Sequence, residues 1–240
     1  MRVHRNIAFV DLSGFTALTE AEGDERAVAV LTTFRALVRD ICSRRGVRIA
    51  KWLGDGAMLV SVEGKPVLSA TLEMQHAVAV ARLPIPLRCG VSSGEVILFE
   101  GDDYIGHAIN VAARLCEMAP DGVVLATGVA DDQPHVDARA TITDDLPRWG
   151  AVLSTDEMAV RGLERPIPVA RVGLRALDAA ASPDPVCGLP LIPSVAEASA
   201  TDGLGQDVWF CSQSCRDTWE QRPRPLTDGQ GSLRTPLIGT

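Results

Sequence analysis

Two aspartates of this sequence stand where their types and surroundings could do chemistry. Asp11 lies near the end of the apolar run Asn6–Leu12, and Asp55 lies in the turn Gly54-Asp55-Gly56 between two further apolar runs. Each alone is more simply explained as a solvated strand-end or turn carboxylate. If their strands are neighbours, however, two close carboxylates repel each other unless a cation lies between them. Together they predict a site for Mg²⁺ or Mn²⁺.

Further polar candidates follow along the chain. Lys51 interrupts an otherwise apolar strand-like run, so it is either an edge residue or a positioned donor. Asp103 lies in a turn-like stretch, where loop chemistry alone could explain it. Asn110 and Arg114 are four residues apart and therefore share one helix face, either as a surface pair or as part of a site.

Apolar periodicity and turn residues predict the elements that must position these side chains. Strands are expected over Asn6–Leu12, Val47–Leu53, Ala57–Val62, Leu87–Val91, Glu95–Phe99, Val123–Ala126, Val136–Ile142, Met158–Val160 and Ile167–Val172. Helices are expected over Asp24–Arg45, which ends before Gly46, over Val67–Leu83 and over Ala108–Met118. Turns are expected at Gly54-Asp55-Gly56 and at Ser92-Ser93-Gly94. The order predicts an α+β, ferredoxin-like βαββαβ sandwich, with its helices on one face of a mostly antiparallel sheet.

Three blocks of the sequence resemble the signature blocks of the class III nucleotidyl cyclase catalytic domain: Phe9–Thr16, Lys51–Gly56 and Asp103–Arg114. The resemblance covers roughly Arg5–Val172, and we expect the catalytic domain over residues 1–175. It implies a homodimeric adenylate cyclase that converts ATP to 3′,5′-cyclic AMP and pyrophosphate. Two alternatives stay open: a guanylate cyclase, and a catalytically silent nucleotide-binding or metal-sensing signalling module.

The resemblance also implies a role for each candidate residue. Asp11 and Asp55 bind two Mg²⁺ or Mn²⁺ ions per active site, Lys51 and Asp103 read the purine, and Asn110 and Arg114 serve the transition state. Metal ions on paired carboxylates can activate the ribose 3′-hydroxyl and neutralise the departing pyrophosphate. Arg161, in the sequence Val-Arg-Gly-Leu, resembles a basic residue that reaches the terminal phosphate.

Phosphate and ribose contacts can be assigned on chemical grounds. The backbone N–H groups of Gly14, Phe15 and Thr16, at an expected helix start, are suited to cradle the β- and γ-phosphates. Arg114 can donate two hydrogen bonds to the α-phosphoryl oxygens, where negative charge builds up, and Asn110 can fix the ribose by hydrogen bonds.

Hydrogen-bond chemistry favours adenine over guanine. Adenine presents an N6 donor and an N1 acceptor, which match an Asp103 acceptor and a Lys51 donor, whereas guanine reverses that edge. The guanine-selective members of the family resemble one another in having Glu and Cys at these two places, which this chain lacks. ATP is therefore the expected substrate.

The six cysteines divide into two sets. Those expected in the core lie singly in apolar segments, and those expected to form a site lie near the end of the chain: Cys42, Cys89 and Cys116, then Cys187, Cys211 and Cys215. Three thiolates can bind a soft ion such as Zn²⁺ or Cu⁺, although a closed structural zinc site needs a fourth ligand. The alternative is a set of buried or redox-sensitive cysteines.

The segment around the last three cysteines resembles a YHS domain, which we expect over residues 184–223. The resemblance rests on Asp184–Leu189 and Val208–Trp219. It departs from the family at Leu189, where Met is usual, and at Val208-Trp209, where an aromatic pair is usual. A regulatory role is the natural hypothesis for so small a unit. We expect a linker over residues 176–183 and a disordered tail over residues 224–240.

The composition narrows the class of protein. The chain has 240 residues and a formal net charge of −8, with a pI near 5.0, so a nucleic-acid partner is not expected. No apolar run approaches the ~20 residues of a membrane helix, and Met1–Leu12 lacks the features of a signal peptide. The expected protein is cytoplasmic, with no membrane partner.

Overall fold

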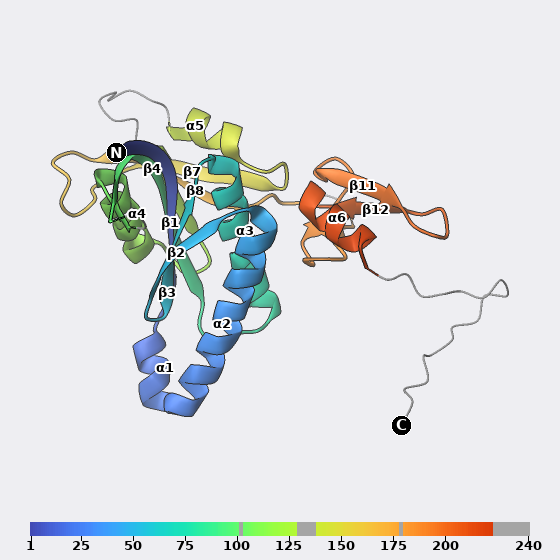
Figure 1. The fold of residues 1–240 in the computed structure, drawn as a ribbon, viewed down its shortest axis with the longest axis horizontal. Helices are drawn as coiled ribbons and strands as arrows, with labels where there is room; N and C mark the ends of the chain where they lie inside the picture. Colours follow the sequence, from blue (N-terminus) through green and yellow to red (C-terminus); the bar gives the residue numbers. More distant parts are fainter. Residues whose placement is uncertain (101–102, 129–137, 178–179, 223–240) are drawn as a thin grey trace.

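The computed structural model of the chain describes residues 1–100, 103–128, 138–177 and 180–222, which form a large sheet-based domain and a small C-terminal unit (Figure 1). The strands of the large domain are β1 (Arg2–Leu12), β2 (Arg48–Leu53), β3 (Gly56–Ser61), β4 (Leu87–Phe99), β5 (Asp103–Ile105), β6 (Val124–Gly128), β7 (Gly150–Met158) and β8 (Ile167–Leu174). Its helices are α1 (Phe15–Glu22), α2 (Asp24–Arg45), α3 (Gly64–Val80), α4 (His107–Met118) and α5 (Ala138–Asp145). The C-terminal unit contains β9 (Ser182–Pro183), β10 (Pro190–Leu191), β11 (Ala198–Thr201), β12 (Asp207–Phe210) and α6 (Gln213–Glu220).

One sheet carries the large domain. Within the described part of the chain its strand order is β2-β3-β1-β4-β6-β8-β7, and β5 pairs with the end of β4. The pair β4–β6 is parallel, and the remaining pairs of this sheet are antiparallel. The elements β1, α2, β2, β3, α3 and β4 follow one another as the sequence predicted, so the α+β, ferredoxin-like βαββαβ arrangement is confirmed.

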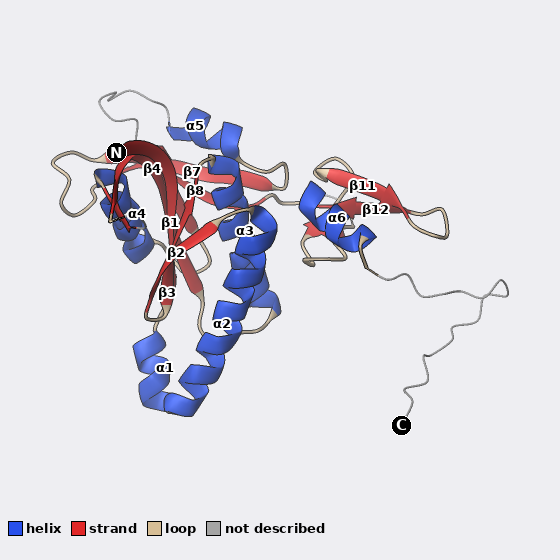
Figure 2. Cartoon of the chain, in the orientation of Figure 1, coloured by secondary structure: helices blue, strands red, loops and turns tan. Residues whose placement is uncertain are grey.

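Helices cover both faces of this sheet. On one face α2 and α3 pack against alternate strand residues such as Val10 and Leu59. On the opposite face Ala112 of α4 packs in a second cluster that contains Ile7 (Figure 2). Gly90 permits this approach, because a Cβ there would lie only 2.2 Å from the Ala112 carbonyl oxygen. The prediction of helices on one face is wrong for α4, since β1 and β3 carry apolar side chains on both faces.

The turn predicted at Ser92-Ser93-Gly94 is also wrong, because β4 runs through it without a break. Ser92 and Ser93 pair with Ile7 and Asn6 of β1 in continuous register. Residues typical of turns are held in a strand here because β1 and β6 hydrogen-bond to them from both sides. Tertiary pairing overrides the local preference.

The region before β8 differs from the prediction as well. The strand expected over Val136–Ile142 is, in its described part, helix α5, and residues 136–137 lie outside the described residues. The strand expected at Met158–Val160 lies earlier, as β7, and ends at Met158. A short apolar run does not by itself distinguish a strand from a helix, and Ile142 is buried as a residue of α5.

Helix α2 begins and ends where the sequence predicted. Gly46 closes it in the left-handed conformation, with φ of 67°, and donates its N–H to the Cys42 carbonyl. The hairpin that follows, β2–β3, turns at Gly54-Asp55 as expected. The cysteines predicted for the core, Cys42, Cys89 and Cys116, are all buried.

The C-terminal unit packs against α2, α3 and the segment before β7. The Trp149 indole donates to the Cys211 carbonyl at 3.0 Å, and Lys65 forms an ion pair with Glu197 at 2.9 Å. Phe210 belongs to the same apolar cluster as the α2–α3 face of the sheet. The small unit is therefore joined to the large domain by polar contacts and by shared apolar burial.

Of the linker predicted over residues 176–183, positions 178–179 lie outside the described residues and the last two positions form β9. The tail predicted over residues 224–240 also lies outside them. None of the described helices has the length and the apolar character needed to cross a bilayer.

Candidate functional site

The two aspartates of the predicted metal pair meet at one end of the sheet. Asp11 in β1 is in register with Gly56 of β3, the residue that follows Asp55. A Cβ at Gly56 would lie 2.9 Å from the Asp11 Oδ1 atom and 2.7 Å from the Val10 carbonyl oxygen, so glycine leaves room for the carboxylate. Partial burial, and to a lesser extent the negative charge of Asp11, raise the pKa of Asp55 above its ordinary value. Such mutual repulsion is what a bound cation relieves.

Arg88, at the start of β4, completes this end of the sheet, and sequence reasoning missed it. Its Nη2 and Nε atoms donate to Oδ2 of Asp11 at 2.7 Å and 3.0 Å. The signal in the sequence was a charged residue inside the apolar run Leu87–Val91. Its partner could not be identified, because the pairing of β1 with β4 is a long-range contact. The guanidinium leaves Oδ1 of Asp11 to other ligands.

The pair predicted to read the purine is assembled within one chain. Lys51 of β2 donates from Nζ to Oδ2 of Asp103 in β5 at 2.5 Å. Asp103 also accepts the Tyr104 backbone N–H at 2.7 Å. The Lys51 hydrogen bond, followed by that of Tyr104, lowers the pKa of Asp103, so this side chain is an ionised acceptor. The two residues lie more than fifty positions apart in the sequence, and only the fold brings them together.

Three further predicted residues share a pocket of about 280 Å³. Its lining includes Asn110 and Arg114 of α4 together with Arg161, from the loop after β7. Arg114 lies partly exposed and donates from Nη1 to both carboxylate oxygens of Glu117, at 2.7 and 2.9 Å. Arg161 thus lines the same pocket as Asn110 and Arg114, from which it is distant in the sequence. Neither Asp11 nor Asp55 lines this pocket.

The predicted phosphate cradle lies at the start of α1. Gly14 adopts the left-handed conformation, with φ of 84°, and Phe15 and Thr16 form the first turn of the helix. The Leu18 N–H donates back to the Gly14 carbonyl, whereas amides of a first helical turn have no acceptor within their own helix. The turn directly follows β1, so these amides stand next to the strand end that carries Asp11.

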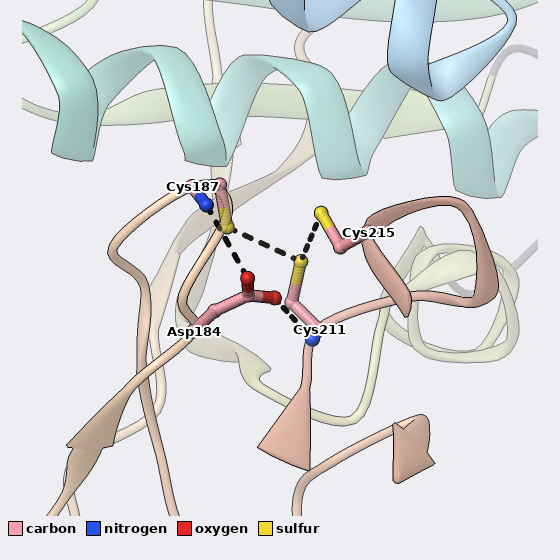
Figure 3. A group of neighbouring side chains, drawn as sticks. All are labelled: Asp184, Cys187, Cys211 and Cys215. Carbon is pink, nitrogen blue, oxygen red and sulfur yellow. Dashed lines mark hydrogen bonds between the residues drawn. The ribbon is translucent and has the colours of Figure 1, made fainter. Parts of the chain in front are cut away.

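The C-terminal cysteines converge, and a fourth residue joins them (Figure 3). The Sγ atoms of Cys187 and Cys211 lie 3.4 Å apart, and those of Cys211 and Cys215 lie 3.5 Å apart. Asp184, which is only 1% exposed, places a carboxylate oxygen within 4.8 Å of these sulfurs. Sequence reasoning missed Asp184, although its position three residues before Cys187 was the available signal.

Hydrogen bonds within the cluster favour a thiolate. The thiols of Cys187 and Cys211 donate toward Cys215 and so lower its pKa below the ordinary value, and the positive charge of Arg45 acts in the same direction. The pKa of Cys187 is raised by the same interactions. Among the core cysteines, burial raises the pKa of Cys42 to about 12.

Relatives of known sequence match part of the chain. No known family profile matches the chain. A Mycobacterium tuberculosis protein described as uncharacterized is 32% identical over 161 residues, which are 67% of this chain and 39% of the relative. The pH-sensitive adenylate cyclase of M. tuberculosis is 33% identical over 135 residues, 55% of this chain and 34% of the relative. The chain thus spans about two fifths or less of the length of these curated relatives.

Solved structures match the large domain. An adenylyl cyclase from P. aeruginosa gives a TM-score of 0.61 at 23% identity, over 75% of this chain and 98% of that one. A guanylate cyclase domain from Catenaria anguillulae, in complex with GTP, gives 0.60 at 18% identity, over 73% of this chain and all (100%) of that one. The large domain therefore has the fold of adenylyl and guanylyl cyclase catalytic domains. Because both nucleotide classes occur among these neighbours, the fold does not select the base.

Proposed function

We propose that the large domain, which shares the fold of adenylyl and guanylyl cyclases, converts ATP to 3′,5′-cyclic AMP and pyrophosphate, and that it does so as a homodimer. The observation that carries the proposal is the meeting of Asp11 and Asp55 at one end of the sheet, beside the first turn of α1. Neighbouring carboxylates next to the amides of a first helical turn are suited to a metal–triphosphate complex.

The residues at this end of the sheet fit divalent metal ions. Asp11 and Asp55 would hold Mg²⁺ or Mn²⁺, because both are carboxylates, both are only partly buried, and both lie at the same end of the sheet. Bound there, such ions supply activation of the ribose 3′-hydroxyl and neutralisation of charge on the departing pyrophosphate.

The protein's own groups then bind and orient the nucleotide. The amides of Gly14, Phe15 and Thr16 donate to phosphate oxygens, and Arg88 fixes the rotamer of Asp11 through its paired hydrogen bonds. Arg114 exchanges Glu117 for the α-phosphoryl oxygens, where charge increases in the transition state. Asn110 holds the ribose, and Arg161 reaches the terminal phosphate.

Lys51 and Asp103 select the base in this proposal. Lys51 and Asp103 already form a hydrogen bond with each other, so the pair is ordered before the nucleotide binds. Adenine can accept a hydrogen bond from Lys51 at N1 and donate one from N6 to Asp103. Guanine reverses donor and acceptor on this edge, so neither residue would find a matching group. The proposed substrate is therefore ATP.

A direct assay tests the proposal. The purified full chain is incubated with ATP or GTP and with Mg²⁺ or Mn²⁺, and the products are separated and identified. We expect cyclic AMP and pyrophosphate in equal amounts. Formation of cyclic GMP with little cyclic AMP would overturn the assignment of the base, and formation of neither product would overturn the assignment of the reaction.

A further inference from the structure

We propose that Asp184, Cys187, Cys211 and Cys215 form a four-ligand site for a divalent ion of the zinc type, and that Arg44 and Arg45 transmit its occupancy through α2 to the hairpin that carries Asp55. The metal site stands independently of the proposed cyclase activity. Only the consequence for catalysis rests on that function.

The ligand set has the size and chemistry of a closed zinc site. Tetrahedral zinc with ~2.3 Å bonds to sulfur separates its sulfur ligands by about 3.8 Å. The observed Sγ–Sγ distances, 3.4 and 3.5 Å, need only a small opening to reach that value. Asp184 supplies the fourth ligand that the three cysteines lack.

Asp184 is held in place by the backbone around it. Its Oδ1 atom accepts the Val186 N–H at 2.8 Å and the Cys187 N–H at 3.3 Å, and its Oδ2 atom accepts the Cys211 N–H at 2.8 Å (Figure 3 draws the two contacts with the cysteines). Oδ2 accepts one of these bonds and a carboxylate oxygen can accept two, so a lone pair of Oδ2 remains for an ion. The carboxylate thereby joins the segment of Cys187 to the end of β12, where Cys211 lies.

Two arginines of α2 reach the sulfurs of this site. Arg45 donates from Nη2 to Sγ of Cys211 at 2.9 Å, and Arg44 donates from Nη1 to Sγ of Cys215 at 3.6 Å. Three thiolates and a carboxylate exceed the charge of one divalent ion by two. The two guanidinium groups oppose this excess, although Glu73 already offsets part of their charge. Donors to metal-bound ligands tune and orient a metal site in this way.

The same arginines are fixed on their other side by Glu73 of α3. This carboxylate is 1% exposed and lies 2.6 Å from a guanidinium nitrogen of Arg44 and of Arg45. If either arginine moved away, a buried charge would lose part of its compensation, which is costly. A movement of the sulfur atoms on metal binding therefore displaces α2 and α3, because Arg44 and Arg45 cannot reorient freely.

Residues in the middle of α2 contact the β2–β3 hairpin, which carries Asp55. Arg35 donates from Nη2 to the Gly54 carbonyl at 2.9 Å, next to Asp55. The guanidinium groups of Arg35 and Arg39 lie 4.9 and 5.2 Å from the centre of the Trp52 ring. Arg35 and Arg44 are about 14 Å apart along the helix axis, given 1.5 Å per residue. One rigid helix thus contacts both sites.

Metal binding is tested on the full chain under reducing conditions. Co²⁺ is added as a spectroscopic probe, since sulfur ligands give it an intense charge-transfer absorption, and Zn²⁺ is then used to displace it. We expect one thiolate-bound Co²⁺ per chain and a loss of affinity of at least tenfold in Asp184→Asn and in Cys215→Ser. Asp202→Asn is the matched control, because Asp202 also accepts backbone N–H groups within the same unit but lies away from the sulfurs.

Two results would overturn the metal site. The first is the lack of the charge-transfer absorption in the reduced, folded wild-type chain. The second is an affinity in Asp184→Asn equal to that of wild type, which would remove Asp184 from the ligand set.

The transmission step is tested without nucleotide turnover. Electron paramagnetic resonance of free Mn²⁺ measures its affinity for the Asp11–Asp55 pair with and without one equivalent of Zn²⁺. We expect Zn²⁺ to change the Mn²⁺ affinity about fivefold or more, the usual scale of linkage between sites. Arg45→Lys should abolish this change while Zn²⁺ binding remains, because one ammonium group cannot replace both contacts of the guanidinium.

Arg26→Lys is the control for this step, since Arg26 lies at the other end of α2 and forms an ion pair with Glu22 at the surface. An Mn²⁺ affinity that is indifferent to Zn²⁺ would overturn the transmission even if the protein proves to be an active cyclase. A linked Mn²⁺ affinity in a chain that forms no cyclic nucleotide would support transmission and contradict the proposed function alone.

Discussion

Asp11 is shared between two kinds of partner, and this determines what its substitution should do. Its Oδ2 atom is occupied by Arg88, while Oδ1 faces the space that Gly56 leaves open beside Asp55. A carboxylate that is fixed on one oxygen presents the other in a defined direction. In the proposed site Arg88 therefore positions Asp11, and Asp11 itself is the metal ligand.

We expect Asp11→Asn and Asp55→Asn to lower cyclic nucleotide formation by about 100-fold or more, because each removes an anionic ligand for the catalytic metal ions. The fold should be retained. Since burial and Asp11 raise the pKa of Asp55, its charged form is disfavoured in the folded protein, and neutralising it relieves repulsion. Product formation with Mn²⁺ and thermal unfolding measure the two effects. Asp121→Asn, at an exposed position, is the control, and retention of substantial activity in either variant would refute the two-metal assignment.

The Lys51–Asp103 pair makes a second prediction at the scale of single residues. Lys51→Glu combined with Asp103→Cys should lower the use of ATP relative to GTP, because each mispaired polar group costs about 1–3 kcal/mol. The ratio of kcat/KM for ATP to that for GTP is the measurement. Both side chains lie at the surface of the sheet edge, so unfolding is not the expected outcome. An unchanged ratio would show that other residues read the base.

At the scale of elements, α4 depends on the flat surface that Gly90 provides. A Cβ at this position would lie 2.2 Å from the Ala112 carbonyl oxygen and 2.2 Å from the Cys116 N atom, both of them helix backbone. Gly90→Ala must therefore displace α4, and overpacking of this kind costs about 1–3 kcal/mol or more. We expect a lower unfolding temperature together with loss of activity, since Asn110 and Arg114 move with the helix. Gly203→Ala, where a Cβ would meet nothing within 4 Å, should leave both unchanged; an equally stable Gly90→Ala protein would contradict this account of the helix contact.

The contact between α2 and the β2–β3 hairpin makes a further prediction. Arg35→Met removes the hydrogen bond to the Gly54 carbonyl while keeping an apolar stem against Trp52. The cost in stability should be small, about 1 kcal/mol, because the buried Nε atom of Arg35 has no hydrogen-bond partner among the described residues and its removal offsets part of the loss. The affinity for Mn²⁺ should fall more clearly, since the turn of Asp55 loses its anchor. An unaltered Mn²⁺ affinity would mean that α2 does not hold the turn.

The sequence predicted those elements whose local signals agree with their long-range contacts. Helix α2 has helical periodicity and a closing glycine, and it formed as expected between Asp24 and Arg45. The turn at Ser92-Ser93-Gly94 failed because pairing with β1 decides the conformation there. Arg88 and Asp184 were missed for the same reason, since their roles depend on partners brought close by the fold.

At the scale of the whole molecule, the candidate residues fall into separate groups. Asp11 and Asp55 lie at a strand end, whereas Asn110 and Arg114 line a pocket on α4 that includes neither aspartate. Helix α4 packs its Ala108–Ala112 side against the sheet and turns Asn110 outward, where the side chain is exposed. A residue that faces outward can serve a site completed by a second copy of the chain. Head-to-tail pairing about a two-fold axis would give two equivalent sites per homodimer.

This arrangement predicts complementation between two inactive proteins. Asp11→Ala lacks a metal ligand and Arg114→Ala lacks the group for the α-phosphoryl oxygens, so each alone should be inactive. In a mixed dimer both defects fall in one site, and the other site carries neither. Random exchange of subunits makes about half of the dimers mixed, each with one of its two sites intact, so roughly a quarter of wild-type activity should return. Subunit exchange is verified with differently tagged chains. Mixing Asp11→Ala with Asp55→Ala is the control, because each chain then supplies a defective metal pair to one site and no intact site can form. If verified exchange restores no activity to the first mixture, the catalytic groups must act within one chain, and Asn110 and Arg114 would have to reach the metal pair of their own sheet.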